Sequence, residues 1–163
     1  MKHTLSVLVN DQPRVLARVA ALLGRRNFNI ESISVGESEE RGLSRMVIVT
    51  HGDERTMEQV QKQLHKLVDV IKVQDLSDHP AVERELLLVK VEAGPAARIE
   101  ISGILEPFRA SVVDVGSHSL MVQATGERSK LDALLDLLRP YGIKELARTG
   151  VTALSRSVSR VGV

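Results

Sequence analysis

Hydrophobic residues in the first part of the chain switch from an alternating pattern to a helical one. The alternation over residues 4–9 predicts a β-strand whose inner face carries Leu5, Val7 and Val9. Pro13 then suits the first position of a helix. The apolar stripe of that helix follows helical spacing and comprises Val15, Leu16, Val19, Leu22 and Leu23. Gly24, followed by the cations Arg25 and Arg26, marks its end.

The other apolar runs of the first half predict a hairpin, a second helix and a closing strand. The strands are expected at 28–35, 43–50 and 69–76. The first of these changes its apolar face near Glu31 and Ser32, which predicts a β-bulge. Polar residues between two glycines at 36–42 form the hairpin connection. Asp53 is suited to cap the helix, whose stripe comprises Met57, Val60, Leu64, Leu67 and Val68.

The second half repeats this order after a polar linker at 77–80. Its elements are a strand at 84–92, a helix opened by Gly94 and Pro95, strands at 110–115 and 118–125, a leucine-rich helix over 131–138 and a strand at 143–148. Two successive βαββαβ units predict an α+β protein with two ferredoxin-like domains, each an antiparallel sheet with helices on one face. We place these domains at 1–78 and 79–163. The tail 155–163 has no firm pattern, and we expect it to be mobile or to pack on a partner.

The open face of each predicted sheet favours association with another copy of the chain. Domains of this size bury only about 60% of their unfolded surface. An apolar sheet face left in water is an exposed patch of the kind that marks interfaces. We therefore expect a dimer.

Composition excludes several classes of function. The chain of 163 residues carries 22 Lys and Arg against 21 Asp and Glu, and aromatic residues make up 2%. Neither a basic patch nor a stacking platform for nucleic acid is therefore expected. The absence of Cys excludes thiolate metal sites and cysteine nucleophiles. No membrane span or leader segment is evident, so we expect a soluble, cytoplasmic protein.

Catalytic and metal-binding patterns are not visible in the sequence. The five histidines stand singly, without the spacing of paired metal ligands, and are interpreted as ordinary surface or cap residues. No nucleophile elbow, P-loop or dinucleotide motif follows a strand. Glu37, Glu39 and Glu40 are read as solvated loop residues. Arg25 and Arg26 are interpreted as compensating the helix dipole rather than as a phosphate clamp.

The junction of the first strand with the first helix, residues 10–16, is the candidate binding site. A helix N-terminus presents unpaired N–H groups and the positive end of the helix dipole. It therefore suits a small carboxylate, such as an amino acid. An ordinary capped helix start is the alternative interpretation of the same residues.

Several stretches of the sequence resemble the regulatory, or small, subunit of acetolactate synthase. In the first half the similar strings are 29–36 (NIESISVG), 43–46 (LSRM) and 62–70 (KQLHKLVDV). In the second half they are 83–91 (ERELLLVKV), 108–110 (FRA), 113–115 (VDV) and 143–150 (IKELARTG). The resemblance spans nearly the whole chain. It implies an N-terminal ACT domain, which has the βαββαβ fold expected above, and a second ferredoxin-like domain.

This resemblance also implies a function in the biosynthesis of isoleucine, valine and leucine. Members form homodimers through their ACT domains, activate a separate catalytic subunit and, in most cases, let valine inhibit it. The catalytic chain would condense two pyruvates to acetolactate and CO2 on thiamine diphosphate, Mg²⁺ and FAD. The present chain would then have no catalytic residue, metal or cofactor of its own.

The family's valine site lies at the ACT dimer interface. The matching positions here are Asp11, Gln12, Pro13, Arg14, Val15 and Leu16 on one side, with Asn29 and Ile30 on the other. Members usually have Gly at the position of Arg14, so we expect Arg14 to alter effector binding, by filling the pocket or by bonding the carboxylate. Position 27 is Asn where Gly is usual, a mild change because Asn tolerates left-handed geometry.

Three other classes of protein are alternatives to the regulatory subunit. A free-standing amino-acid sensor with the same ACT fold would have no enzyme partner. A small ferredoxin-like hydrolase would need a convergent polar cluster, which the sequence does not offer, and the lack of Cys excludes a metallochaperone.

Overall fold

A computed structural model describes residues 1–157 of the chain, which form two compact units. Unit 1 comprises Met1–Val82 and the segment from Val151 onward, and unit 2 comprises Glu83–Gly150. Each unit carries helices on an antiparallel sheet, so the predicted α+β fold with two ferredoxin-like domains is confirmed. The domain boundaries predicted from the sequence differ from these units, because they place residues 79–163 together in the second domain. Residues 158–163 of that range lie outside the part of the chain that the structure describes.

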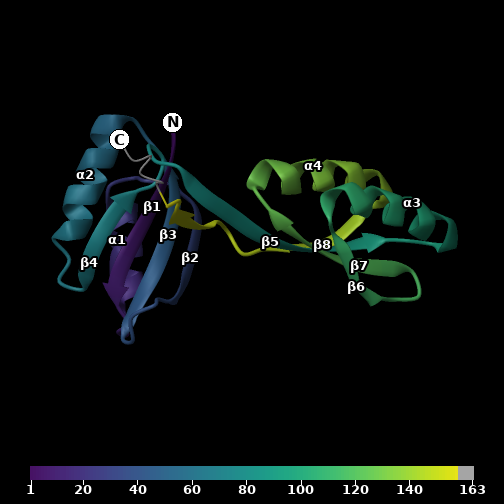
Figure 1. The fold of residues 1–163 in the computed structure, drawn as a ribbon, viewed down its shortest axis with the longest axis horizontal. Helices are drawn as coiled ribbons and strands as arrows, with labels where there is room; N and C mark the ends of the chain where they lie inside the picture. The colour runs from purple at the N-terminus through teal and green to yellow at the C-terminus, as the bar shows by residue number, and fades with distance from the viewer. Residues whose placement is uncertain (158–163) are drawn as a thin grey trace, which may run out of the picture. The chain divides into compact units, whose positions relative to one another are not determined.

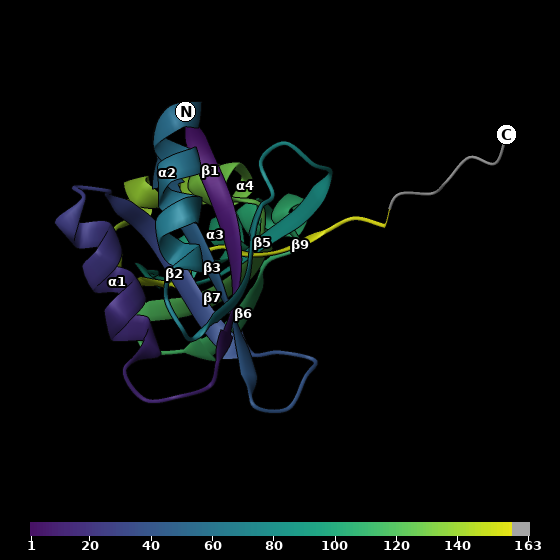
Figure 2. The ribbon, with the colours of Figure 1, turned by 90° about the vertical axis from the view of Figure 1, so that its left-hand side faces the viewer.

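Unit 1 is a four-stranded sheet with both of its helices on one face. Its elements are β1 (Lys2–Asn10), α1 (Val15–Arg25), β2 (Ile30–Glu37), β3 (Leu43–His51), α2 (Glu54–His65) and β4 (Val70–Asp75). The strand order is β2-β3-β1-β4, so β2 and β4 are the edge strands (Figure 1). In Figure 2, α1 and α2 lie in front of the strands of this unit and cover the same face of its sheet.

The core of unit 1 lies between the sheet and the two helices. Because strand side chains alternate between faces, every second residue of β1 is turned toward the helices. The fully buried members from the strands and helices are Leu5, Val7, Val9, Met46, Ile48, Val19, Leu23, Met57, Val60 and Leu64. Burying each such side chain contributes about 1.5–3 kcal/mol to folding. The two periods in the sequence therefore predict the core correctly.

The bulge predicted near Glu31 is present in β2. Ile30 pairs with Thr50 of β3, whereas Ser32 pairs with the adjacent Val49, so Glu31 is the extra residue. The shift turns Ile33 toward the helices and Ser32 and Ser34 toward the opposite, open face of the sheet. The bulge therefore explains why the apolar residues of this strand change face near Glu31, as predicted.

The end of the described chain covers part of the open face of unit 1. Val151 is 1% exposed, and the short strand β9 (Thr152–Ser155) pairs with β5. Just past the end of β9, the N–H of Arg156 donates to the carbonyl of Pro80 at 2.7 Å. A small second core forms on this face from Val47, Val49, Leu76, Ala81, Val151 and Ala153. By its contacts this segment groups with unit 1 rather than with the second predicted domain, because its apolar residues complete the first sheet.

Unit 2 repeats the architecture with strand order β6-β7-β5-β8. Its elements are β5 (Ala81–Glu92), α3 (Pro95–Leu105), β6 (Ser111–Val115), β7 (Ser119–Gly126), α4 (Arg128–Leu138) and β8 (Ile143–Arg148), with single 3-10 turns at Glu106–Phe108 and Arg139–Tyr141. The predicted leucine stripe of α4 is fully buried, with Leu131, Leu134, Leu135 and Leu138 at its centre. Pro95 occupies the first helical turn of α3, as expected.

Candidate functional site

The first half of the predicted effector site is a tight turn between β1 and α1. The N–H of Val15 donates to the carbonyl of Gln12, and Arg14 has φ 73° and ψ −4°. These values, with Pro13 before them, are those of a type II turn, which favours Gly at the third position. The helix starts at Val15, so the prediction that Pro13 opens it is wrong: the left-handed Arg14 interrupts the helical backbone.

Three backbone N–H groups at this turn are free to meet a ligand. In the part of the chain that the structure describes, nothing accepts a hydrogen bond from the N–H of Arg14, Leu16 or Ala17. The α1 N-terminus has no side-chain cap and no acidic residue in its first turn. An external carboxylate would therefore meet unsatisfied donors and the positive end of the helix dipole.

Neighbouring segments hold the turn in place from both sides. The N–H of Asp11 donates to the carbonyl of Gly42 in the β2–β3 hairpin at 2.9 Å. Arg18, one turn into α1, donates to Asp69 at 2.9 Å. The turn is thus positioned by contacts that leave Gln12 and Arg14 exposed.

The second half of the site, Asn29 and Ile30, lies where α1 leads into β2. Asn27 has φ 56°, and the N–H groups of Asn27 and Phe28 donate to Gly24 and Leu23. This is a Schellman ending, in which Asn tolerates the left-handed position. The tolerance predicted for Asn27 is therefore observed.

Thr50 fixes the backbone at the start of β2. Its hydroxyl donates to the carbonyl of Asn29 at 2.8 Å. The side chain of Asn29 is exposed, whereas Ile30 packs partly on the core. This half of the site is thus held in place by the neighbouring strand β3.

One chain does not bring the two halves of the predicted site together. Ile30 and His3 both pair with Thr50 at one end of the sheet, whereas Asn10 pairs with Leu43 at the other end. From His3 to Asn10 the strand rises roughly 23 Å at about 3.3 Å per residue. Asn29 and Ile30 are therefore separated from residues 11–16 by most of the length of β1.

One histidine departs from the sequence interpretation. His3 is 3% exposed, and its Nδ1 lies 2.9 Å from Oδ2 of Asp75. Although partial burial disfavours its charge, hydrogen bonds from Ser77 and His3 hold the pKa of Asp75 below its ordinary value. His3 is therefore a buried structural residue that ties β1 to β4, not a surface or cap histidine. A single His in a strand of alternating apolar residues does not reveal from sequence that its ring is buried against a distant carboxylate.

Residues 1–157 contain neither a cluster of metal-ligating side chains nor a membrane-spanning helix. No group of three or more His, Asp or Glu side chains in this range is placed to hold a metal ion. None of the helices described there is long and apolar enough to cross a membrane.

Comparison with known proteins gives consistent matches over both halves of the chain. Residues 5–72 match the model of the AHAS small subunit-like ACT domain, and residues 84–157 match that of the small subunit of acetolactate synthase. The chain is 50% identical over 161 residues to the acetolactate synthase small subunit of Bacillus subtilis, covering 98% of this chain and 94% of that protein.

Two further relatives come from other lineages. A probable acetolactate synthase small subunit of Archaeoglobus fulgidus is 53% identical over 156 residues, covering 96% of this chain and 98% of that protein. The crystal structure of the acetolactate synthase small subunit from Thermotoga maritima superposes with a TM-score of 0.90 at 43% identity. It covers 97% of this chain and 99% of that one.

Proposed function

Because the chain belongs to the family of acetolactate synthase small subunits, we propose that it is a regulatory subunit that activates the catalytic chain and makes it sensitive to valine. In this proposal the catalytic chain holds thiamine diphosphate, Mg²⁺ and FAD. The present chain contributes the effector site and the contact with the catalytic subunit, in the cytoplasm.

The observation that carries this proposal is the separation of the two half-sites within one chain. β2 is an edge strand, and Val35 on it is 46% exposed. If β2 pairs antiparallel with β2 of a second copy, the start of one strand faces the end of the other. That end leads into the hairpin that Asp11 contacts through Gly42. A two-fold homodimer therefore brings Asn29 of one protomer to the turn of its partner.

The chemistry of the paired half-sites suits a small apolar amino acid. The free N–H groups of Arg14, Leu16 and Ala17 are donors for its carboxylate. The amide of Asn29 offers an acceptor for its ammonium group. Leu16, which is 47% exposed, offers an apolar surface to a short aliphatic side chain. Valine carries all three of these groups.

The test is acetolactate formation by the catalytic subunit of the same source, with and without this chain, across a valine titration. The proposal requires that the chain raise the rate and that valine remove the gain. An unchanged rate at every valine concentration would leave a free-standing amino-acid sensor as the function. Copurification with the catalytic subunit separates these two outcomes independently of activity.

A mixing experiment tests whether the effector site is shared between protomers. Asn29→Ala and Leu16→Glu each disable a different half-site, so each homodimer should lose its response to valine. After the two variants are unfolded and refolded together, each heterodimer has one intact site and one doubly altered site. Partial recovery of valine binding supports the shared site, and no recovery contradicts it.

A further inference from the structure

A short segment near the end of the described chain, residues 151–153, lies on the open face of the unit 1 sheet. We call this segment the strap. Val151 and Ala153 are 1% and 3% exposed, and they pack with Val47 and Val49 of β3. The strap is therefore buried like a core segment of unit 1, although it directly follows unit 2 in the sequence.

Two serine hydroxyls attach the strap to β2. The hydroxyl of Ser34 donates to the carbonyl of Val151 at 2.8 Å, and the hydroxyl of Ser32 accepts from the N–H of Val151 at 3.3 Å. Among the described residues, no ladder of backbone hydrogen bonds joins the strap to β2. A side-chain hydrogen bond makes a modest net contribution to stability. This attachment can therefore open at a smaller cost than the loss of a paired strand.

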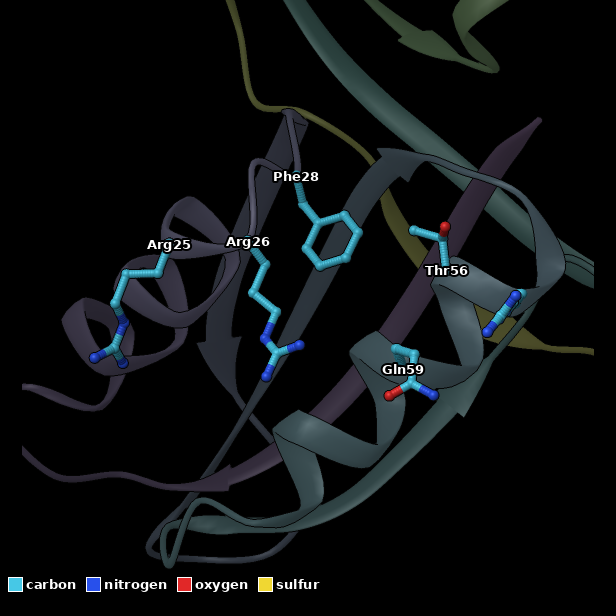
Figure 3. A pocket seen from close by; sticks show the side chains of 6 residues that line it. Arg25, Arg26, Phe28, Thr56 and Gln59 are labelled. Atoms are coloured by element: carbon cyan, nitrogen blue, oxygen red, sulfur yellow. The ribbon is translucent and has the colours of Figure 1, made fainter.

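The strand that holds the strap also carries half of the predicted effector site. Asn29 directly precedes β2, and Ser32 lies two residues after Ile30, the first residue of the strand. On the helix side, Phe28 packs on the core, and Figure 3 shows its ring directed toward the start of α2, where Thr56 lies. The start of β2 is thus held by Phe28 on one face of the sheet and by the strap on the other.

A single residue separates the strap from a residue that is bonded within unit 2. The N–H of Thr149 donates to the carbonyl of Leu86 at 3.1 Å, and its hydroxyl accepts from the N–H of Leu86 at 3.0 Å. Gly150 follows with φ 82°, a left-handed conformation that Gly adopts without strain. The Cα atoms of Thr149 and Val151 are at most about 7 Å apart. So short a connection transmits a displacement, whereas a long flexible linker would absorb it.

We propose that the strap is a regulatory device that couples the effector site to unit 2. This inference rests on the proposed valine site, in which Ser32 and Ser34 are positioning residues rather than ligands. A ligand shifts a conformational equilibrium only when it binds one state better than the other. Here the state that binds valine better is the one in which the strap is attached to β2. Linkage then requires that release of the strap weaken valine binding and that bound valine strengthen the attachment.

Ser6 offers a control that separates regulation from simple stabilisation of the sheet. Val47 of β3 pairs with Ser34 of β2 on one side and with Ser6 of β1 on the other. Both serines are partly buried, but the hydroxyl of Ser6 makes no hydrogen bond among residues 1–157. Ser6→Ala therefore removes the same group from the same face of the sheet without removing a bond to the strap.

Hydrogen exchange of the full chain, followed by mass spectrometry without and with saturating valine, measures the coupling. Valine should slow exchange at residues 151–153 about fivefold or more in wild type and in Ser6→Ala. In Ser34→Ala this difference should disappear, and calorimetry should show a valine affinity lower by about fivefold or more. Urea denaturation verifies that both variants are folded. Equal valine affinity in Ser34→Ala and wild type overturns the proposal.

A longer connection tests transmission separately from positioning. A four-residue Gly/Ser segment inserted between Gly150 and Val151 leaves the strap and the effector site in place but removes the short link. With the catalytic subunit, this variant should keep its activation and its valine affinity, whereas most of the inhibition by valine should be lost. Full inhibition would show that the signal does not pass through Gly150, which also overturns the proposal.

The same measurements distinguish this inference from the proposed function. If wild type binds no valine, the proposed function fails and the regulatory strap fails with it. If valine binds but exchange at residues 151–153 does not change, only the inference about the strap fails. A change confined to residues 81–84 of β5 would place the signal in the other connection between the units and would likewise contradict it.

Discussion

Ser34 donates a hydrogen bond to the backbone carbonyl of Val151 at 2.8 Å, although 117 residues separate them. The N–H of Val151 in turn donates to the hydroxyl of Ser32 at 3.3 Å. The two serines face the open side of the sheet because of the bulge at Glu31. The two serine hydroxyls thus bond the backbone of Val151 on both sides, as the backbone of an adjacent strand would. The side chain of Val151 then covers Val47 and Val49.

Replacing Val151 with Ala should destabilise unit 1. The change removes buried methyl groups and leaves a small cavity, so the free energy of unfolding should fall by about 2 kcal/mol. Leu154→Ala is the control, because Leu154 is 59% exposed and its loss should change stability by about 0.5 kcal/mol or less. Urea denaturation measures both. Equal effects would show that the segment does not stabilise the sheet.

Breaking the buried ion pair of unit 2 should have a larger effect. Glu85 is 3% exposed and accepts from Nε of Arg148 at 3.1 Å, while Arg148 also donates to Asp132 at 2.6 Å. Arg148→Met leaves a buried carboxylate without its partner, which costs about 3–5 kcal/mol.

The matched control for Arg148→Met is an exposed ion pair on the same sheet. Lys90 donates to Glu145 at 2.8 Å, but the Glu145 side chain is 73% exposed. Lys90→Met should therefore cost less than about 1 kcal/mol. Thermal unfolding followed by calorimetry compares the two variants. Similar losses for both would contradict a special role for the buried pair.

Arg14→Gly should stabilise the chain and change its affinity for valine. A left-handed residue with a side chain costs roughly 1–2 kcal/mol, and the greater flexibility of unfolded Gly returns part of this, leaving a gain of about 1 kcal/mol. Arg14→Ala keeps the left-handed strain and should not be stabilised, so it is the control.

Calorimetry with valine on the same proteins tests the effect of Arg14 on the effector. Weaker binding in Arg14→Gly shows that the guanidinium bonds the carboxylate, and tighter binding shows that it fills the pocket. Equal affinity in wild type and Arg14→Gly would mean that this residue has no part in recognition.

The β2–β3 hairpin should lose an interaction in acid. Two hydrogen bonds from Arg45, at 2.8 and 3.1 Å, lower the pKa of Glu39 from 4.5 to about 2. Because the folded pKa is the lower one, the interaction contributes stability above pH 4.5 and loses it as the pH falls toward 2. Carboxyl NMR titration should place the Glu39 midpoint at about 2 in wild type. Arg45→Gln should raise that midpoint, and Arg41→Gln should leave it in place; an unmoved midpoint in Arg45→Gln would contradict the pairing.

The local pattern of apolar and polar residues was sufficient to predict the helices and strands and most of each hydrophobic core. The change of apolar phase at Glu31 predicted the bulge, because a strand must shift register to keep its apolar face inward. The start of α1 was predicted two residues early because Pro13 is an ordinary helix opener, and the left-handed state of Arg14 leaves no mark on periodicity. The chemistry of a helix N-terminus indicated the half of the effector site at residues 10–16, whereas the half at Asn29 and Ile30 came from family resemblance alone.

The features that depend on neighbours along the chain follow from the sequence alone: the two βαββαβ units, their buried stripes and the bulge in β2. Tertiary structure alone decided which distant segments meet. It returned Val151 to the first sheet, buried His3 against Asp75 and placed Asn29 and residues 11–16 at opposite ends of β1. The spacing of apolar residues gives the period of a single helix or strand. These contacts depend instead on how strands and helices pack together, and that packing is set by the apolar surface buried over the whole unit.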